Sequence, residues 1–139
     1  MAASSPKRSR PFARTRQDHA QETAEDYVEA IGEILNEQGV CRSADLARLF
    51  GVSHVTINKT VARLKAANLV ESDPYGPLRL TRKGERLAST SKQRHDLVLA
   101  FLVSLGVSEE QARVDAEGIE HHVSKETLEA FQRVLKRES

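Results

Sequence analysis

The chain has a single cysteine, no apolar stretch long enough to cross a membrane, and no acidic residue before Asp18. Because Cys41 cannot form an internal disulfide, we expect a reducing, cytoplasmic compartment. A membrane span needs roughly 20 consecutive apolar residues, so we predict no membrane partner. The basic start is not followed by an apolar run, which argues against a secretory signal.

The formal net charge of +1 conceals a strong asymmetry along the 139 residues. Residues 1–17 carry only basic charges, whereas acidic residues outnumber basic ones between Glu109 and Glu129. A basic front and an acidic back suggest two different partners, a polyanion and a cation.

Residues 1–21 are rich in Ser, Arg, Lys and Pro and show no apolar periodicity, so we predict a disordered basic arm. This arm could contact DNA phosphates or merely aid solubility, and the sequence favours neither. Thr23 is a candidate cap for a helix that reaches Gln38, with Tyr27 and Ile31 on its apolar stripe and Gly39 at its end.

The next stretch, SADLARLFGVSHVTINKTVARLKAANLVES, predicts a helix-turn-helix. Ser43 is expected to cap a short helix, Gly51 to permit a tight turn, and Ser53 to cap a second helix with a polar outer face. Leu69–Ser72 and Leu78–Thr81 are strand-like, and Pro74, Gly76 and Pro77 supply a turn between them. A hairpin directly after the second helix is typical of a winged helix.

A second helix of this kind fits the major groove of double-stranded DNA and presents polar side chains to base edges. We expect the first-turn residues to lie deepest, two cations to contact phosphates, and the wing to reach the backbone or minor groove. The candidate DNA-binding residues are Ser53, His54, Thr56, Lys59, Arg63, Tyr75 and Arg79. The alternative is a solvated helix face, or a winged helix that contacts proteins.

Three further helices are predicted after the wing. Thr81 caps a long helix reaching about Leu105, Ser108 with Gln111 resembles a capping box for a helix to about His122, and Ser124 begins the last helix. The fold class is therefore mostly α, with an arm (1–21), an N-terminal winged helix-turn-helix domain (22–88) and a helical domain (89–139).

The segment DAEGIEHHVS puts two like-charged carboxylates and an imidazole on one helix face. Glu117, Glu120 and His121 stand at i, i+3 and i+4, which is unfavourable unless a cation neutralises the carboxylates. Asp26 and Glu29 share a face of the first helix. His95 is in register with Leu99 and Leu102 on the long helix, so we expect it to point toward the protein interior. Each has an ordinary alternative: a helix-terminus charge, a satisfied buried histidine, or a solvated face. Periodicity alone does not bring these segments together.

AEDYVEAI, the winged helix, QRHDLVLAFL and DAEGIEHHVS together resemble the diphtheria toxin repressor family, and most of all its manganese-responsive branch. The resemblance implies a metal-binding and dimerisation domain whose metal orders a homodimer for operator binding. It implies that the metal ligands are Asp26, Glu29, His95, Glu117, Glu120 and His121. The iron-responsive branch has methionine where Asp26 stands and cysteine where Glu117 stands.

An oxygen-rich set without thiolate suits Mn²⁺, with Fe²⁺ as a weaker alternative, and four carboxylates suggest two ions per chain. The chain ends at Ser139, so we expect no SH3-like domain of the kind that many iron-responsive relatives carry. We predict a manganese-dependent repressor of manganese-uptake genes, with no small organic substrate and no enzymatic activity. The alternatives are a di-metal enzyme in a helical bundle, or a winged-helix regulator without metal.

Overall fold

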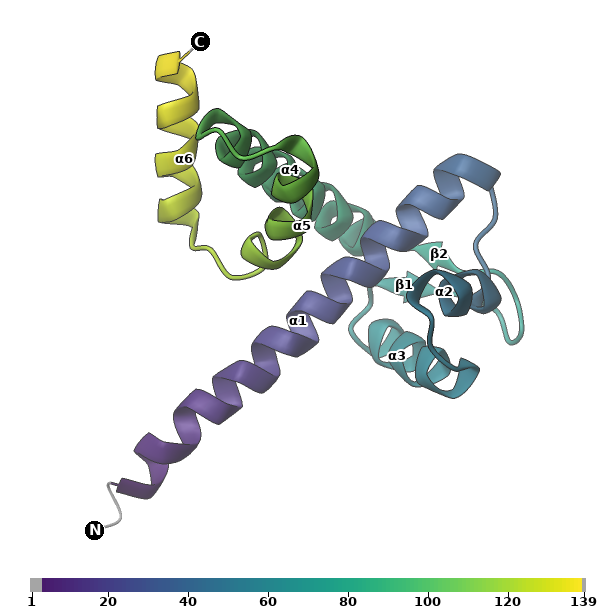
Figure 1. Ribbon diagram of the computed structural model, residues 1–139. Helices are drawn as coiled ribbons and strands as arrows, with labels where there is room; N and C mark the ends of the chain where they lie inside the picture. The colour runs from purple at the N-terminus through teal and green to yellow at the C-terminus, as the bar shows by residue number, and fades with distance from the viewer. Residues whose placement is uncertain (1–3, 139) are drawn as a thin grey trace. The chain divides into compact units, whose positions relative to one another are not determined.

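The computed structural model describes the backbone of residues 4–138 and the side chains of residues 20–137. Residue contacts divide the chain into two compact units (Figure 1). Residues 24–90 form one, called here the winged-helix unit, and residues from Ser91 onward together with the chain up to Thr23 form the other, the helical unit. Within the described range, no helix combines the length and apolarity needed to span a membrane.

The first helix, α1, runs from Ser4 to Gln38, so it begins well before the predicted cap at Thr23. The predicted arm over residues 1–21 overlaps the beginning of this helix, and its disorder stays a prediction. The predicted end is confirmed, since Gly39 follows with a φ of 79°.

The helix-turn-helix is confirmed as α2 (Ser43–Phe50) and α3 (His54–Ala66). Gly51 between them adopts a φ of 64°, a left-handed conformation that glycine tolerates. The Ser53 side chain accepts a hydrogen bond from the Thr56 amide at 3.2 Å, as a cap should. The predicted cap at Ser43 is wrong by one residue, because Arg42 is the N-cap and its amide donates to the Asp45 carboxylate at 2.8 Å.

The wing is a hairpin of two short antiparallel strands, β1 (Val70–Glu71) and β2 (Arg79–Leu80). Val70 pairs with Leu80, and the two strands lie within the ranges predicted from the sequence. The chain enters the wing through Asn68, whose φ of 60° ends α3, and the Leu69 amide donates to the Leu64 carbonyl at 2.9 Å.

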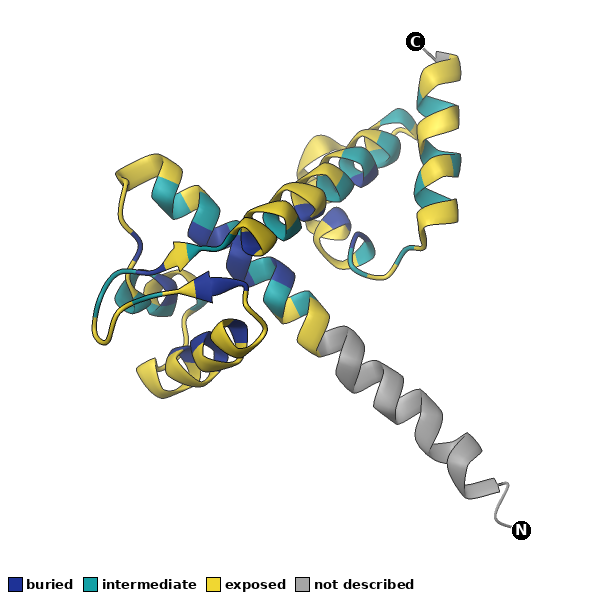
Figure 2. Ribbon diagram, turned by 180° about the vertical axis from the view of Figure 1, so that it is seen from behind, coloured by how far each residue is buried: buried dark blue, intermediate teal, exposed yellow. Residues whose placement is uncertain are grey.

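The core of the winged-helix unit joins α1, α2, α3 and the wing. Its members are fully or nearly excluded from water and come from each of these elements: Tyr27, Val28, Ala30, Ile31, Cys41, Leu46, Ile57, Val61, Leu64, Leu69, Val70 and Leu78. Figure 2 shows the consequence on α3, which is buried on its inner side and exposed on the other. The recognition helix is thus held by its core face while its outer face meets solvent.

The helical unit contains most of α4 (Arg82–Ser104), with α5 (Glu109–Ile119) and α6 (Lys125–Glu138). The predicted caps are confirmed, since Thr81, Ser108 and Ser124 each accept a backbone amide within 3.2 Å. Phe101 of α4 stacks on Phe131 of α6 with ring centroids 4.0 Å apart.

Two details of this unit differ from expectation. The end of α5 comes at Ile119 rather than near His122, although Glu120 keeps helical backbone angles. Leu105 lies after α4 and is 61% exposed, because the chain turns at Gly106, whose φ is 99°. The helix therefore ends at Ser104, one residue before the predicted end at Leu105.

Candidate metal centre and nucleic-acid interface

Three of the predicted metal ligands meet inside the helical unit. His95 comes from α4, Glu117 from the last turns of α5, and Glu120 from the residue that follows α5. The nearest donor atoms of these three side chains all lie within 4.8 Å of one another. The His95 Nδ1 atom is 3.7 Å from a carboxylate oxygen of Glu117 and 3.7 Å from one of Glu120. The fold therefore brings together residues that are more than twenty positions apart.

The environment of this cluster suits a cation. The Glu120 side chain is 1% exposed, and a carboxylate excluded from water costs several kcal/mol unless positive charge compensates it. The His95 Nδ1 is buried and makes no hydrogen bond within the described part of the chain. A separation of 3.7 Å is longer than a hydrogen bond. It is close to the roughly 3–4 Å between two donors that share a divalent ion at about 2.1 Å from each. The donor set therefore fits a metal ion.

The two adjacent histidines have different surroundings. The His121 Nε2 is 3.4 Å from Glu120 Oε1, and its side chain is 2% exposed, so it adjoins the cluster. The His122 Nε2 lies 3.4 Å from Glu22 Oε2 instead, and its side chain is 47% exposed. The two histidines therefore adjoin different carboxylates.

The remaining predicted ligands, Asp26 and Glu29, lie on α1 in the winged-helix unit. They are three residues apart, so they share one face of the helix, and both are half-buried. Their assignment as ligands with the other four stays a prediction.

The seven predicted DNA-binding residues are all exposed. Ser53 and Thr56 are partly engaged with each other, since the Ser53 hydroxyl lies 3.2 Å from that of Thr56. Lys59 and Arg63 project from the middle and end of α3, Arg79 from β2, and Tyr75 from the loop of the wing. Their exposure is required for contact with DNA, but the contacts themselves stay predictions.

One exposed residue of this surface was missed from the sequence. Val55 lies in the first turn of α3, is 63% exposed, and stands between the polar residues His54 and Thr56. An apolar side chain there can contact the methyl group of thymine. The signal that would have found it is the helical register, because Val55 is out of phase with the buried residues Ile57 and Leu64.

Cys41 is separated from any metal chemistry by its environment. Its side chain is fully buried in the core of the winged-helix unit, and this burial, with the nearby Asp45 charge, raises the pKa of the thiol to about 11. A thiol that stays protonated at neutral pH is a poor metal ligand. Cys41 therefore serves as a residue of the apolar core.

Comparison with known proteins finds the same two-part organisation. Residues 19–78 match the iron dependent repressor N-terminal DNA binding domain, and residues 81–138 match the iron dependent repressor metal binding and dimerisation domain. The transcriptional regulator MntR of Escherichia coli O6:H1 is 47% identical over 121 residues, which cover 87% of this chain and 78% of that protein. The HTH-type transcriptional regulator MntR of Bacillus subtilis strain 168 is 35% identical over 105 residues, covering 76% of this chain and 74% of the relative.

Solved structures resemble the chain over a similar extent. A manganese-dependent transcriptional repressor in complex with manganese is 30% identical with a TM-score of 0.73, and the match covers 81% of this chain and 52% of that one. The manganese regulator SloR is 29% identical with a TM-score of 0.71, and the match covers 81% of this chain and 53% of that one. The chain thus spans about half the length of these solved relatives.

Proposed function

Because the chain belongs to the iron-dependent repressor family, whose members are metal-dependent DNA-binding regulators and not enzymes, we propose that Mn²⁺ is the metal that activates it. In this proposal it acts as a homodimer in the bacterial cytoplasm and binds operator DNA of manganese-uptake genes. The observation that carries the proposal is the cluster of His95, Glu117 and Glu120, which combines carboxylate and imidazole donors without a thiolate.

The donor chemistry favours manganese over softer metals. Carboxylates suit hard ions such as Mn²⁺, and imidazole binds borderline ions, so Fe²⁺ is the weaker alternative. We retain Asp26, Glu29 and His121 in the proposed ligand set because the family resemblance assigns them. The set then holds four carboxylates, more than one divalent ion neutralises, and two ions per chain follow from this charge count.

The proposed DNA-binding surface is the outer face of α3 together with the wing. Its polar and basic side chains are exposed, whereas Ile57, Val61 and Leu64 on the opposite face of α3 pack in the core. Metal acts by binding more tightly to the arrangement that binds DNA, and by linkage DNA then tightens metal binding by the same factor.

A titration of Mn²⁺ followed by electron paramagnetic resonance tests this proposal, because free Mn²⁺ gives a sharp signal that weakens on binding. We expect saturation near two ions per chain at micromolar metal. Glu120→Ala and Glu117→Ala should each lose this binding. Glu110→Ala, which removes an exposed carboxylate of α5 outside the cluster, should bind like the unmodified protein.

Glu117 is the safer variant, since its side chain is 64% exposed and its removal should leave the fold intact. Circular dichroism checks that Glu120→Ala, which alters a buried position, is still helical. Binding only at millimolar metal, or equal binding by Glu117→Ala and Glu110→Ala, would contradict the manganese site. The chain would then remain a winged-helix regulator whose metal lies elsewhere.

A further inference from the structure

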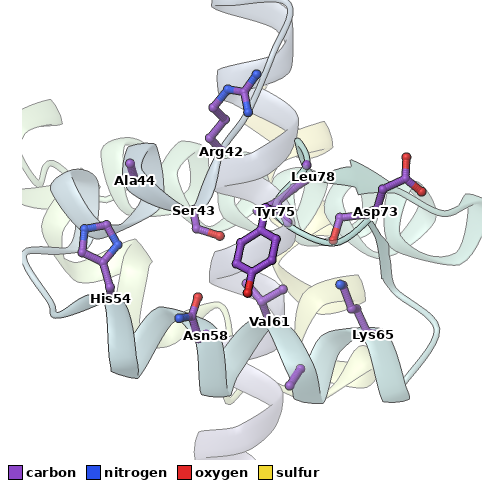
Figure 3. A pocket seen from close by; sticks show the side chains of 13 residues that line it. Arg42, Ser43, Ala44, His54, Asn58, Val61, Lys65, Asp73, Tyr75 and Leu78 are labelled. Atoms are coloured by element: carbon purple, nitrogen blue, oxygen red, sulfur yellow. The ribbon is translucent and has the colours of Figure 1, made fainter.

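A hollow of about 480 Å³ lies in the winged-helix unit between the beginning of α2, one side of α3 and the loop of the wing (Figure 3). Arg42, the N-cap of α2, and Ser43 line it on one side, and His54, Asn58 and Lys65 of α3 line it on the other. Tyr75 stands at its opening, fully exposed to solvent. Of the buried core residues, only Val61 and Leu78 line this hollow, and they form its apolar floor.

The hollow separates the exposed residues of α3 into two groups. His54, Asn58 and Lys65 are spaced by four and seven residues, so they follow one line along the helix beside the wing. Thr56, Lys59 and Arg63 follow another line and do not line the hollow. At 100° per residue the two lines lie roughly 150° apart around the helix. Only one of them can face base edges when the other faces the wing.

The charge and length of the hollow suit a polyanion. Arg42 and Lys65 are cationic, Ser43 and Asn58 add neutral hydrogen-bond donors, and Asp73 is the one acidic side chain in its lining. From His54 to Lys65 the helix rises roughly 16 Å, which is long enough to face several consecutive phosphates of a DNA strand. Arg48 of α2 is a cation that lies outside the hollow, and its guanidinium pairs with the Asp45 carboxylate at 2.5 Å. Arg48 therefore serves as a control for Arg42.

We propose that this hollow holds the sugar-phosphate backbone of one DNA strand, with Arg42 and Lys65 paired to phosphates and the Tyr75 ring against the sugars. This inference rests on the proposed DNA-binding function and adds contacts at Arg42 and Lys65 that the sequence did not indicate. It also moves His54 from base edges to the backbone, and it leaves Val55, Thr56 and Lys59 to face the bases.

The backbone of Tyr75 supports the assignment. Its φ of 60° is unfavourable for a side chain of this size, and glycine would adopt it freely. The ring makes no contribution to the core, since it is fully exposed. A strained, exposed aromatic residue at a wing tip is consistent with a ligand contact rather than with folding.

The salt dependence of DNA binding tests the proposal. Fluorescence anisotropy of a labelled duplex of mixed sequence, with the metal-loaded full chain, gives the slope of log K against log salt concentration. We expect Arg42→Ala and Lys65→Ala each to reduce this slope by about 0.9, and the double variant by about twice that, equally for every duplex sequence. Arg48→Ala, which removes the same charge from α2, should leave the slope unchanged.

Two results would overturn the inference: an unchanged slope for Lys65→Ala, or the same reduction for Arg48→Ala as for Arg42→Ala. If the unmodified protein fails to bind any duplex at any metal concentration, the proposed function fails as well. If it binds and only Lys59→Ala or Arg63→Ala changes the slope, the proposed function stands and the hollow is excluded. The Tyr75→Gly variant should bind DNA more weakly than the unmodified protein, while its melting temperature should be equal or higher. A lower melting temperature of the variant would show that Tyr75 contributes to folding instead.

Discussion

At the scale of single residues, exclusion from water has opposite consequences for Glu120 and Cys41. Glu120 is 1% exposed but adjoins His95 and His121, so its carboxylate lies among groups that can share a cation. Cys41 is fully buried among apolar side chains, and its thiol stays protonated. The neighbours of a buried group, rather than burial itself, decide whether it can bind metal.

The raised pKa of Cys41 makes stability depend on pH. In the unfolded chain the pKa of the thiol has its ordinary value of 9.0, whereas in the folded protein it is about 11. Between these values only the unfolded state loses the proton, so the free energy of unfolding should fall as pH rises, by up to about 3 kcal/mol. Urea denaturation at several pH values measures this. Cys41→Ala should show a shallower fall, and parallel curves for the two proteins would contradict the assignment.

Val55 is expected to contribute to sequence preference and not to stability. It is 63% exposed, so Val55→Ser should leave the melting temperature unchanged but remove contact with a thymine methyl group. The loss should be about 1 kcal/mol at one base pair. Selection from a randomised duplex library, with both proteins, would show a relaxed preference at that position. Leu49→Ser, at an exposed position of α2, is the control, and an identical selected sequence for Val55→Ser would refute the contact.

At the scale of helices and strands, end signals were more informative than apolar stripes. Ser53, Thr81 and Ser108 were predicted as caps, and Ser124 as the start of the last helix; each accepts a hydrogen bond from the amide three residues on. The caps predicted at Thr23 and Ser43 were wrong, since α1 begins at Ser4 and Arg42 is the N-cap of α2. A cap is a local interaction, so a few residues determine it. The beginning of α1 at Ser4 was not predicted, because residues 1–21 carry no apolar stripe.

Gly84 shows how closely two elements approach in the winged-helix unit. A Cβ atom built at Gly84 in the first turn of α4 would lie 2.1 Å from the Leu69 carbonyl oxygen, so the backbones meet where only glycine fits. We expect Gly84→Ala to reduce the free energy of unfolding by about 1–3 kcal/mol, since α4 or the wing must shift.

Gly32 is the matched control, because a Cβ there would meet only Leu80 Cδ1 at 3.7 Å, an ordinary contact. Gly32→Ala lies inside α1 and should be neutral or stabilising by up to about 1 kcal/mol. Urea denaturation followed by circular dichroism measures both variants. Equal free energies of unfolding for Gly84→Ala and Gly32→Ala would contradict the close approach of the α4 backbone to the Leu69 carbonyl at Gly84.

At the scale of the whole molecule, the family assignment implies an assembly that a single chain does not display. The dimerisation domain covers residues 81–138, and within it Val103, Leu105 and Val114 are large apolar side chains exposed to solvent. Val114 also borders a shallow hollow of about 580 Å³ together with Gly118 and Ile119 of α5. Burial of such apolar surface against a second subunit would stabilise a dimer.

We therefore expect Val114→Glu to weaken the homodimer by about thirtyfold or more in dissociation constant, which corresponds to about 2 kcal/mol. Sedimentation equilibrium measures the change directly. Val40→Glu places the same charge on an exposed valine of the winged-helix unit and should leave the dimer intact. If Val114→Glu dimerises as tightly as the unmodified protein, the α5 hollow lies outside the interface.

The sequence by itself determined the mostly helical fold, the helix-turn-helix with its wing, and the family. These follow from interactions within a few residues, such as the Ser53 cap, the Gly51 turn and the register of Ile57 and Leu64. Helical spacing in the DAEGIEHHVS motif also put Glu117 and Glu120 on one face, and the family resemblance implied that they are metal ligands.

Local spacing does not decide which distant residues meet, and only the tertiary structure shows the donor atoms of His95, Glu117 and Glu120 together, as the family resemblance implied. His95 lies 22 positions before Glu117, and no periodicity relates them, yet α4 and α5 bring their donor atoms to 3.7 Å. In the same way, packing of the wing beside α3 divides the polar face of that helix, with Lys65 in the hollow and Lys59 outside it. The physical reason is that a side chain's spacing along a helix depends on the local backbone, whereas its neighbours depend on how the elements pack.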